Sequence, residues 1–408
     1  MQINSFLKHF LISLFIYIFL VLAIFCYLNY LGIHSIFNEK SLLKFDAALY
    51  QDIKNQCYHQ YWLCAFFPAF PFIWKFLSIG IYGISIFNAL VFIFSSSLLA
   101  QHYKLKWQFQ LFFQSIPSLI FMFIPYTEAI FFLSSVLVIL GLDKKNNWLL
   151  LFGLLLCSLS RPTTFVFIPV IIISYFISIL SFKELLQKII WPTIVLVLGL
   201  FVTILIHYNY THTWLVFFAA QKLWNNYLHF PSLPLRSWGG DAINRYDGSV
   251  IFIMLVLLTF IFKTTKNRIQ GIVDSRNDLI FSSLYIIATT ILILAYRDGC
   301  LYSLNRFIYA TPFVVVVFYH FFETYIFSWK DVWLVFILSE IVWVLFGSYN
   351  HIHNFLLFTC VSVYFMLLVF VKNKSRIISI ASLIILILLN SYGFIKLASR
   401  FLIGGWIG

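Results

Sequence analysis

Long apolar runs, separated by short polar segments, dominate this chain from end to end. Stretches such as 279–296 and 377–395 are continuously apolar over about the ~20 residues that a helix needs to cross a bilayer. Strands of a membrane barrel would instead alternate apolar and polar positions. Backbone groups in lipid must also be hydrogen-bonded within the protein. The pattern therefore predicts an all-α, polytopic membrane protein.

The apolar runs predict about thirteen transmembrane helices in one integral membrane domain that covers 1–408. Their expected positions are 8–32, 76–100, 108–125, 127–142, 147–160, 162–181, 189–207, 248–262, 279–296, 303–321, 332–347, 353–371 and 377–395. The run 147–160 is short for a simple span and is expected to be tilted, broken or re-entrant. Two long polar segments, 33–75 and 208–247, are expected to form loops on the same face. The helices of about 316–408 have no assigned role.

Composition and charge support the membrane assignment. The chain is 62% hydrophobic and 10% charged, whereas soluble domains are about 45–50% apolar and about 25% charged. The net charge of +13 does not indicate nucleic acid, because the basic residues lie in short clusters between apolar runs, as in proteins whose Lys and Arg set topology. With the N-terminus inside, the short outer connections and the tail hold only five of the 27 Lys and Arg residues. The composition favours a bacterial inner membrane, with the endoplasmic reticulum as the alternative.

The first long loop holds the most informative polar residues. If 45–54 forms a helix in the membrane interface, Phe45, Leu49 and Ile53 fall on one apolar stripe, and Asp46 projects elsewhere. A solvated amphipathic loop explains the same pattern equally well.

The segment FFPAFP that follows is expected to break helix geometry twice, because each proline removes a donor and restrains the residue before it. This predicts a rigid, aromatic entry into the next span. A second carboxylate, Asp52, lies six residues after Asp46.

Ionisable residues recur at helix ends on the predicted outer face. Glu128, Arg161, Arg297 and Arg306 all lie at or near such ends. Charged groups at membrane depth are costly and are therefore candidates for function. Snorkelling to the interface would explain any one of them, but their convergence with Asp46 on one face favours a functional site.

The second long loop contains Gln221, Trp224 and Arg236. Aromatic residues and arginine suit an interfacial anchor and a sugar-and-phosphate cleft equally well. Cys57 and Cys64 share the first loop and could either pair or remain free thiols.

The sequence predicts no metal site. It contains no CxxC motif, which makes zinc improbable. His351 and His353 supply only two ligands. A divalent ion that assists the chemistry stays open.

Several motifs, in order, resemble the PIG-V family of polyprenol-phosphate-dependent mannosyltransferases and their bacterial relatives in the GT-C superfamily. The first is an aromatic residue and Asp46, with Tyr50 four and Ile53 seven residues after the aspartate, followed by FFPxxP. The later matches are Tyr126-Thr127-Glu128, Ser160-Arg161-Pro162-Thr163, Gln221-Lys222-Leu223-Trp224 with Pro231 downstream, and Asn305-Arg306-Phe307 with Pro312 shortly after.

The resemblance covers about 40–315. Three positions depart from the family pattern: Phe45 replaces a usual Trp, Asn305 replaces Ser, and Thr164 stands where Gly is common. These changes affect the expected sugar specificity more than the expected activity. The last three predicted spans match no known pattern.

The resemblance implies a GT-C-type bundle that transfers a hexose, with mannose as the first candidate, from a polyprenyl-phosphate carrier. The acceptor would be a hydroxyl of a lipid, glycan, glycolipid or protein on the extracytoplasmic face, and transfer would invert the anomeric centre. Membrane lipids are further expected partners; nucleic acid is not.

The same resemblance implies roles for individual residues. Asp46 falls on the family's catalytic acidic position, where a base would take the acceptor proton. The leaving lipid phosphate calls for arginine. The expected substrate-binding residues are Tyr50, Asp52, Glu128, Arg161, Gln221, Trp224, Arg297 and Arg306.

Other function classes fit the composition. A multi-pass transporter or lipid-carrier flippase would favour acidic relays within spans and internal repeats, whereas these spans are nearly uncharged and no repeat is evident. A scaffold subunit without chemistry would not need an intact Asp46 loop. An O-antigen polymerase or ligase would be expected to carry a large loop rich in Arg and His.

Overall fold

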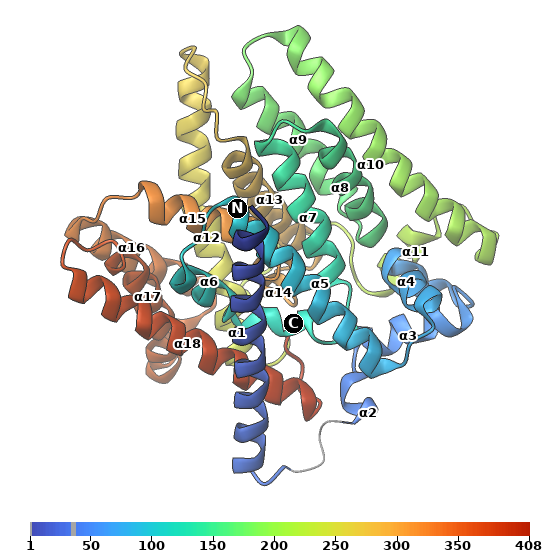
Figure 1. The fold of residues 1–408 in the computed structure, drawn as a ribbon, viewed down its shortest axis with the longest axis horizontal. Helices are drawn as coiled ribbons and strands as arrows, with labels where there is room; N and C mark the ends of the chain where they lie inside the picture. The colour runs from blue at the N-terminus through green and yellow to red at the C-terminus, as the bar shows by residue number, and fades with distance from the viewer. Residues whose placement is uncertain (1, 34–37) are drawn as a thin grey trace.

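The computed structural model describes residues 2–33 and 38–408 and places them in an all-α bundle (Figure 1). Among the described residues, the only β structure is an isolated bridge between Arg236 and Cys300. The first helices are α1 (Gln2–Tyr30), α2 (Glu39–Leu42), α3 (Asp46–Gln56), the 3₁₀ helix η1 (Tyr61–Ala65), α4 (Ala69–Leu77), α5 (Ile81–His102), α6 (Trp107–Gln114), the 3₁₀ helix η2 (Pro117–Met122), α7 (Glu128–Asp143), α8 (Asn147–Ser160), α9 (Thr164–Ser178) and α10 (Phe182–Thr211). The later helices are α11 (Val216–Leu223), α12 (Asp241–Ile269), α13 (Asn277–Tyr296), α14 (Leu304–Tyr309), α15 (Pro312–Thr324), α16 (Trp329–Val344), the 3₁₀ helix η3 (Ser348–Asn350), α17 (Ile352–Phe370) and α18 (Arg376–Leu402).

Within the described residues, 7 helices are long and apolar enough to cross a membrane: α1, α5, α10, α12, α13, α17 and α18. Three shorter apolar helices, α8, α9 and α15, lie among them. Many of their large hydrophobic side chains are exposed on the outside of the bundle. Lipid is the solvent that accommodates such a surface. The chain is therefore an integral, multi-pass membrane protein.

Two of the predicted continuous spans are interrupted. The span predicted at 108–125 divides into α6, which ends at Gln114, and the 3₁₀ helix η2, which begins at Pro117. The span predicted at 303–321 divides into α14 and α15 around an extended Thr311. Proline explains both breaks, since it disfavours helical geometry at the preceding residue and readily begins a new helix.

The first long loop is more helical than the sequence predicted. It contains a helix over Asp46–Gln56, but the buried stripe is Ala47, Tyr50 and Ile53, rather than the predicted Phe45, Leu49 and Ile53. Phe45 precedes the helix with φ 53°. The register shifts because Tyr50 packs edge-on against Phe66, with ring centroids 5.3 Å apart.

The prolines of FFPAFP begin a helix instead of breaking one. Pro68 caps α4 and Pro71 lies in its first turn, where the missing N–H has no helical partner to lose. In the second loop, α10 continues to Thr211 and α12 begins at Asp241. The connection between these helices is therefore 212–240, shorter than the predicted 208–247.

Glycines allow α7 and α8 to pack closely at the centre of the bundle. A Cβ at Gly153 would lie 2.8 Å from the Ser134 carbonyl oxygen and the Val138 nitrogen, and one at Gly141 would lie 2.5 Å from the Leu150 nitrogen. Small residues let helix backbones approach in membranes. This contact matters for function because it fixes the start of α7 against the end of α8.

Replacing Gly153 with alanine is expected to destabilise the bundle by about 1–3 kcal/mol, the usual cost of overpacking. The thermal unfolding midpoint of the purified protein in detergent measures the loss. Gly80→Ala is the matched control, because a Cβ at Gly80 would meet only Glu39 Oε1 at 4.0 Å. An unchanged midpoint for Gly153→Ala would contradict the tight contact.

The C-terminal helices bring the end of the chain to the first loop. In Figure 1, α16, α17 and α18 lie on the side of the bundle opposite α8, α9 and α10. Beyond α18, the ring of Trp406 packs edge-on against Phe45, with centroids 4.9 Å apart, and lies 5.5 Å from Trp238. Lys44 donates a hydrogen bond to the carbonyl oxygen of Leu402 at 2.6 Å. The region without an assigned role thus supports the segment that carries Asp46.

Candidate functional site

Four charged side chains from distant parts of the sequence meet in one cluster: Asp46, Glu128, Arg161 and Arg306 (the charged cluster). Arg306 donates from Nη1 to Asp46 Oδ2 at 2.6 Å and from Nε to Glu128 Oε1. Arg161 Nη2 lies 2.5 Å from the same Glu128 oxygen. The Glu128 carboxylate thus holds the guanidinium groups of both arginines, and the guanidinium of Arg306 also reaches Asp46.

Helix ends position the members of the charged cluster. Asp46 and Glu128 are the first residues of α3 and α7, and Arg161 caps the C-terminal end of α8. Each charge is complementary to the helix dipole at its position. Arg306 lies in the short α14, which exists as a separate helix because Pro312 begins α15.

Burial differs among the four side chains and separates their roles. The Glu128 side chain is 0% exposed, and those of Arg306 and Arg161 are 4% and 6% exposed. The Asp46 side chain is 22% exposed. Buried charges are stable only when paired, so Glu128 is required to hold the two arginines. Asp46 is the member that a molecule from outside can reach.

Aromatic rings surround the arginines. The Arg306 guanidinium lies 4.5 Å from the ring centroid of Tyr126 and 5.1 Å from that of Phe121. The Arg161 guanidinium lies 4.7 Å from the ring of Phe131. Such cation–π contacts stabilise a cation in a desolvated site. Together they restrict where the arginines can point.

Tyr50 lies beside the charged cluster but contributes packing. Its side chain is 4% exposed, and its ring contacts Phe66 and Phe70 edge-on. Burial, together with the negative charge of Asp46, holds the pKa of Tyr50 well above its ordinary value. The phenol therefore stays neutral, and the packing of its ring holds the buried face of α3 in place.

A buried polar network borders the cluster and was missed by sequence reasoning. Asp247 Oδ1 accepts hydrogen bonds from the backbone N–H and the side-chain amide of Asn305, both at 2.7 Å. Ser237 donates to the other Asp247 oxygen, and Ser118 donates to Asn305 Oδ1 at 2.8 Å. The network fixes the residue next to Arg306. In the sequence, Asp247 lies just before an apolar run, where a polar loop residue is common, so nothing marked it as part of a site.

Arg297 belongs to a second network. Its Nε donates to Asn226 Oδ1 at 3.2 Å, and its guanidinium lies 3.8 Å from the ring centroid of Tyr302. Asn226 also accepts from the Tyr302 hydroxyl at 2.9 Å and donates to Gln221 at 2.7 Å. Among the described residues, no carboxylate forms an ion pair with Arg297. Its positive charge is therefore uncompensated by direct contact.

A cavity of about 380 Å³, the arginine cavity, joins these two regions. Arg161, Arg297, Lys222 and Gln221 contribute its polar wall. Its apolar wall includes Phe165, Val166, Phe217, Phe218, Leu228, Leu292, Ile293 and Phe307. Three cations and an apolar wall form a space suited to an anionic group attached to hydrocarbon. Arg161 Nη1 is buried and has no hydrogen-bond acceptor among the described residues, so part of its donor capacity is unused.

Two other residues predicted to bind substrate lie elsewhere in the structure. Asp52 is 3.8 Å from His59 and contacts no arginine of the cluster. Trp224 donates from its indole N–H to the Trp62 carbonyl at 3.3 Å and packs edge-on against Phe66. Trp224 thus ties the loop after α11 to the first loop. Asp52 and Trp224 line neither of the two cavities described for this protein.

Within the part of the chain that is described, no three His, Cys, Asp or Glu side chains come together to hold a metal ion. Cys57 and Cys64 are both buried free thiols. Burial raises the pKa of Cys64 to about 12, so its thiol is inert at neutral pH.

Comparison of the chain with protein-family profiles, with curated proteins and with solved structures finds no match. A functional assignment therefore depends on the geometry of the charged cluster and of the arginine cavity.

Proposed function

We propose that this protein is a membrane glycosyltransferase of the GT-C type. It transfers a hexose, with mannose as the first candidate, from a polyprenyl-phosphate carrier to an acceptor hydroxyl on the extracytoplasmic face. The proposal rests on the position of Asp46, an accessible carboxylate that forms an ion pair with Arg306. Arg161, in the same charged cluster, also lines the arginine cavity. Displacement of a lipid phosphate from a sugar requires a base for the acceptor hydroxyl and nearby cations that bind the leaving phosphate.

In the proposed reaction, Asp46 takes the proton of the acceptor hydroxyl as its oxygen attacks the anomeric carbon. The bond between that carbon and the phosphate oxygen breaks, and its electron pair leaves with the polyprenyl phosphate. Attack and departure on opposite faces invert the anomeric centre. Of the four clustered side chains, Asp46 is the most exposed, which suits a group that must meet the acceptor.

Arg161 and Arg297 are the candidates for holding the phosphate. Both line the arginine cavity with Lys222, and the hydrogen-bond partners of Arg297 among the described residues are uncharged. Charge that develops on a leaving phosphate is stabilised by such preorganised donors. The apolar wall built around Phe217 and Phe218 suits the first units of a prenyl chain. Gln221, which lies in the polar wall of the same cavity, is a candidate sugar contact.

The test uses the purified protein in nanodiscs, radiolabelled polyprenyl-phosphate mannose and a mixed membrane-lipid acceptor pool. Label that moves to a new product supports the proposal. If no label moves and intact donor is recovered, the same labelled lipid is placed in one leaflet of proteoliposomes. Protein-dependent movement to the other leaflet would replace the proposal with the flippase alternative. If the lipid does not flip either, the donor sugar is varied next, starting with glucose and galactose.

Replacing Arg161 with alanine is expected to weaken donor use more than acceptor use. Hydrogen bonds to a charged group contribute about 1.5–3 kcal/mol, so kcat/KM for the donor should fall roughly ten- to hundredfold. Steady-state kinetics with each substrate varied in turn measures the split. Arg161→Lys keeps the charge and should recover part of the loss. A larger effect on the acceptor would assign Arg161 to the acceptor side.

A further inference from the structure

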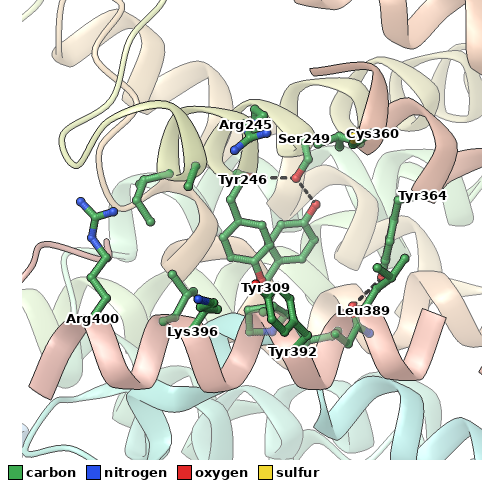
Figure 2. A pocket seen from close by; sticks show the side chains of 18 of the residues that line it. Arg245, Tyr246, Ser249, Tyr309, Cys360, Tyr364, Leu389, Tyr392, Lys396 and Arg400 are labelled. Carbon is green, nitrogen blue, oxygen red and sulfur yellow. Dashed lines mark hydrogen bonds between the residues drawn. The ribbon is translucent and has the colours of Figure 1, made fainter. Parts of the chain in front are cut away.

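A second and larger cavity is lined mostly by helices other than those that line the arginine cavity. It has a volume of about 790 Å³ and is lined mainly by α1, α12, α17 and α18, with Pro117 of η2, Tyr309 of α14 and Phe318 of α15 (the lateral cavity). None of Asp46, Glu128, Arg161 or Arg306 lines it. Figure 2 shows its side chains, with Lys396 and Arg400 on α18 and Arg245 across from them.

Polarity in the lateral cavity changes with depth. Arg400 and Lys396 lie near the C-terminal end of α18, and Arg245 lies near the N-terminal end of α12. The cavity continues along α12 to Ile253, and apolar residues such as Phe318 and Leu389 line it farther in. From Ala242 to Ile253 the helix rises about 16 Å, which is close to the ~15 Å hydrocarbon depth of one leaflet.

Within the described chain, the three cations of the lateral cavity have no negative partner. Arg245 donates to the carbonyl oxygens of Asp241 and Leu357, both at 3.1 Å. Lys396 donates to the Tyr27 hydroxyl at 2.5 Å.

Arg400 donates from Nη2 to the Gly239 carbonyl at 2.6 Å, while its Nε is buried without a hydrogen bond among the described residues. The rim of the cavity therefore carries three positive charges that are neutralised by no ion pair in the described part of the protein. A rim of net charge +3 above an apolar interior complements an anion that carries a hydrocarbon chain.

We propose that the lateral cavity binds one anionic phospholipid from the membrane leaflet on the loop side of the bundle. Its phosphate lies among Arg245, Lys396 and Arg400, and its acyl chain lies along α12 toward Ile253. Two of the helices that line the cavity, α1 and α18, also carry large exposed apolar side chains such as Leu22 and Leu388, as expected of helices that contact lipid. The proposal does not depend on the activity proposed for the charged cluster.

The floor of this cavity is connected to the candidate site. The Tyr246 hydroxyl, in the cavity wall, accepts a hydrogen bond from the Ser118 N–H at 3.1 Å. Ser118 in turn donates to Asn305, the neighbour of Arg306. A lipid that orders Tyr246 would therefore also steady the network beside the charged cluster.

The proposal is tested by native mass spectrometry of the full-length, delipidated protein in detergent, titrated with phosphatidylglycerol and, separately, with phosphatidylcholine of the same chains. One molecule of phosphatidylglycerol should bind, in preference to phosphatidylcholine. Each cation near an anionic headgroup contributes about fivefold in affinity, so Lys396→Gln should weaken binding about fivefold, and Lys396→Gln with Arg400→Gln about 25-fold. Lys396 is exposed, which makes its replacement safe for folding.

Arg376→Gln is the matched control, because Arg376 is exposed at the opposite end of the same helix, α18. It should leave lipid binding unchanged. Equal binding of the two lipids, or an equal loss in Arg376→Gln, would overturn the proposal. Displacement of phosphatidylglycerol by an equimolar amount of inorganic phosphate would assign the rim to a free anion instead. Preferential binding of polyprenyl phosphate would assign the cavity to the carrier lipid.

A second readout does not depend on the variants. Cys360 is exposed and lines the lateral cavity, whereas Cys26 is exposed on α1 and does not line it. Phosphatidylglycerol should slow the reaction of Cys360 with N-ethylmaleimide and leave that of Cys26 unchanged. Equal protection of both thiols, or of neither, would contradict occupancy of this cavity.

Discussion

Replacing Asp46 with asparagine should abolish sugar transfer and leave the folded protein intact. The side chain keeps its shape but can no longer accept the acceptor proton, and loss of a positioned base typically costs about 10²- to 10⁴-fold in rate. Folding should survive because Asp46 is partly exposed and Arg306 keeps its second partner, Glu128. Transfer of label from the donor lipid, measured beside the thermal unfolding midpoint, reports both quantities.

Asp52→Asn is the matched control for that experiment. It makes the same change on the same helix, but Asp52 faces His59 at 3.8 Å and not an arginine. Transfer by Asp52→Asn should stay within a few-fold of the wild type. Full activity in a well-folded Asp46→Asn variant would remove Asp46 from the chemistry. An equal loss of transfer in both variants would indicate that activity depends on the total negative charge of α3 and not on Asp46 in particular.

Replacing Glu128 with glutamine should both destabilise the protein and abolish activity. Glu128 is 0% exposed and its Oε1 meets Arg306 and Arg161. Removing its charge leaves Arg161 buried without a carboxylate. Breaking a buried ion pair in this way costs about 3–5 kcal/mol. The unfolding midpoint in detergent should fall clearly below that of Asp46→Asn, which is the comparison that separates a structural from a chemical loss.

Glu340→Gln provides the control for burying an amide in place of a carboxylate. Glu340 lies in α16, and one of its oxygens is buried without a hydrogen bond among the described residues, while the other accepts from Thr359 at 3.4 Å. Because no cation in the described ranges forms an ion pair with it, its replacement should leave the unfolding midpoint nearly unchanged. If Glu128→Gln were as stable as Glu340→Gln, the charged cluster would not depend on its buried carboxylate.

The sequence predicts the long apolar helices well, because each carries its own signal over about 20 residues. The helix breaks before Pro117 and Pro312 are also indicated locally, by the prolines themselves. They were not predicted because the apolar runs continue across both prolines. At Pro68 the opposite error occurred, because a break was predicted where this proline caps the start of α4. Whether a proline ends or begins a helix depends on what the flanking segments pack against, which the local pattern does not contain.

The candidate site could be anticipated only in part. Glu128, Arg161 and Arg306 stood out as charges at the ends of apolar runs, and the structure brings them together with Asp46. Asp247 gave no comparable signal, because its partners Asn305 and Ser237 lie in other segments. Pairing between distant side chains follows from tertiary packing, which periodicity does not encode.

The sequence separation within the charged cluster also orders its assembly during synthesis. Glu128 and Arg161 belong to the adjacent helices α7 and α8, so they can pair as soon as that hairpin has left the ribosome. Arg306 follows Glu128 by 178 positions and Asp46 by 260. A nascent chain therefore carries Asp46 through the insertion of most of its helices before the arginine that will hold it has been translated. The last step of building this site is the arrival of α14.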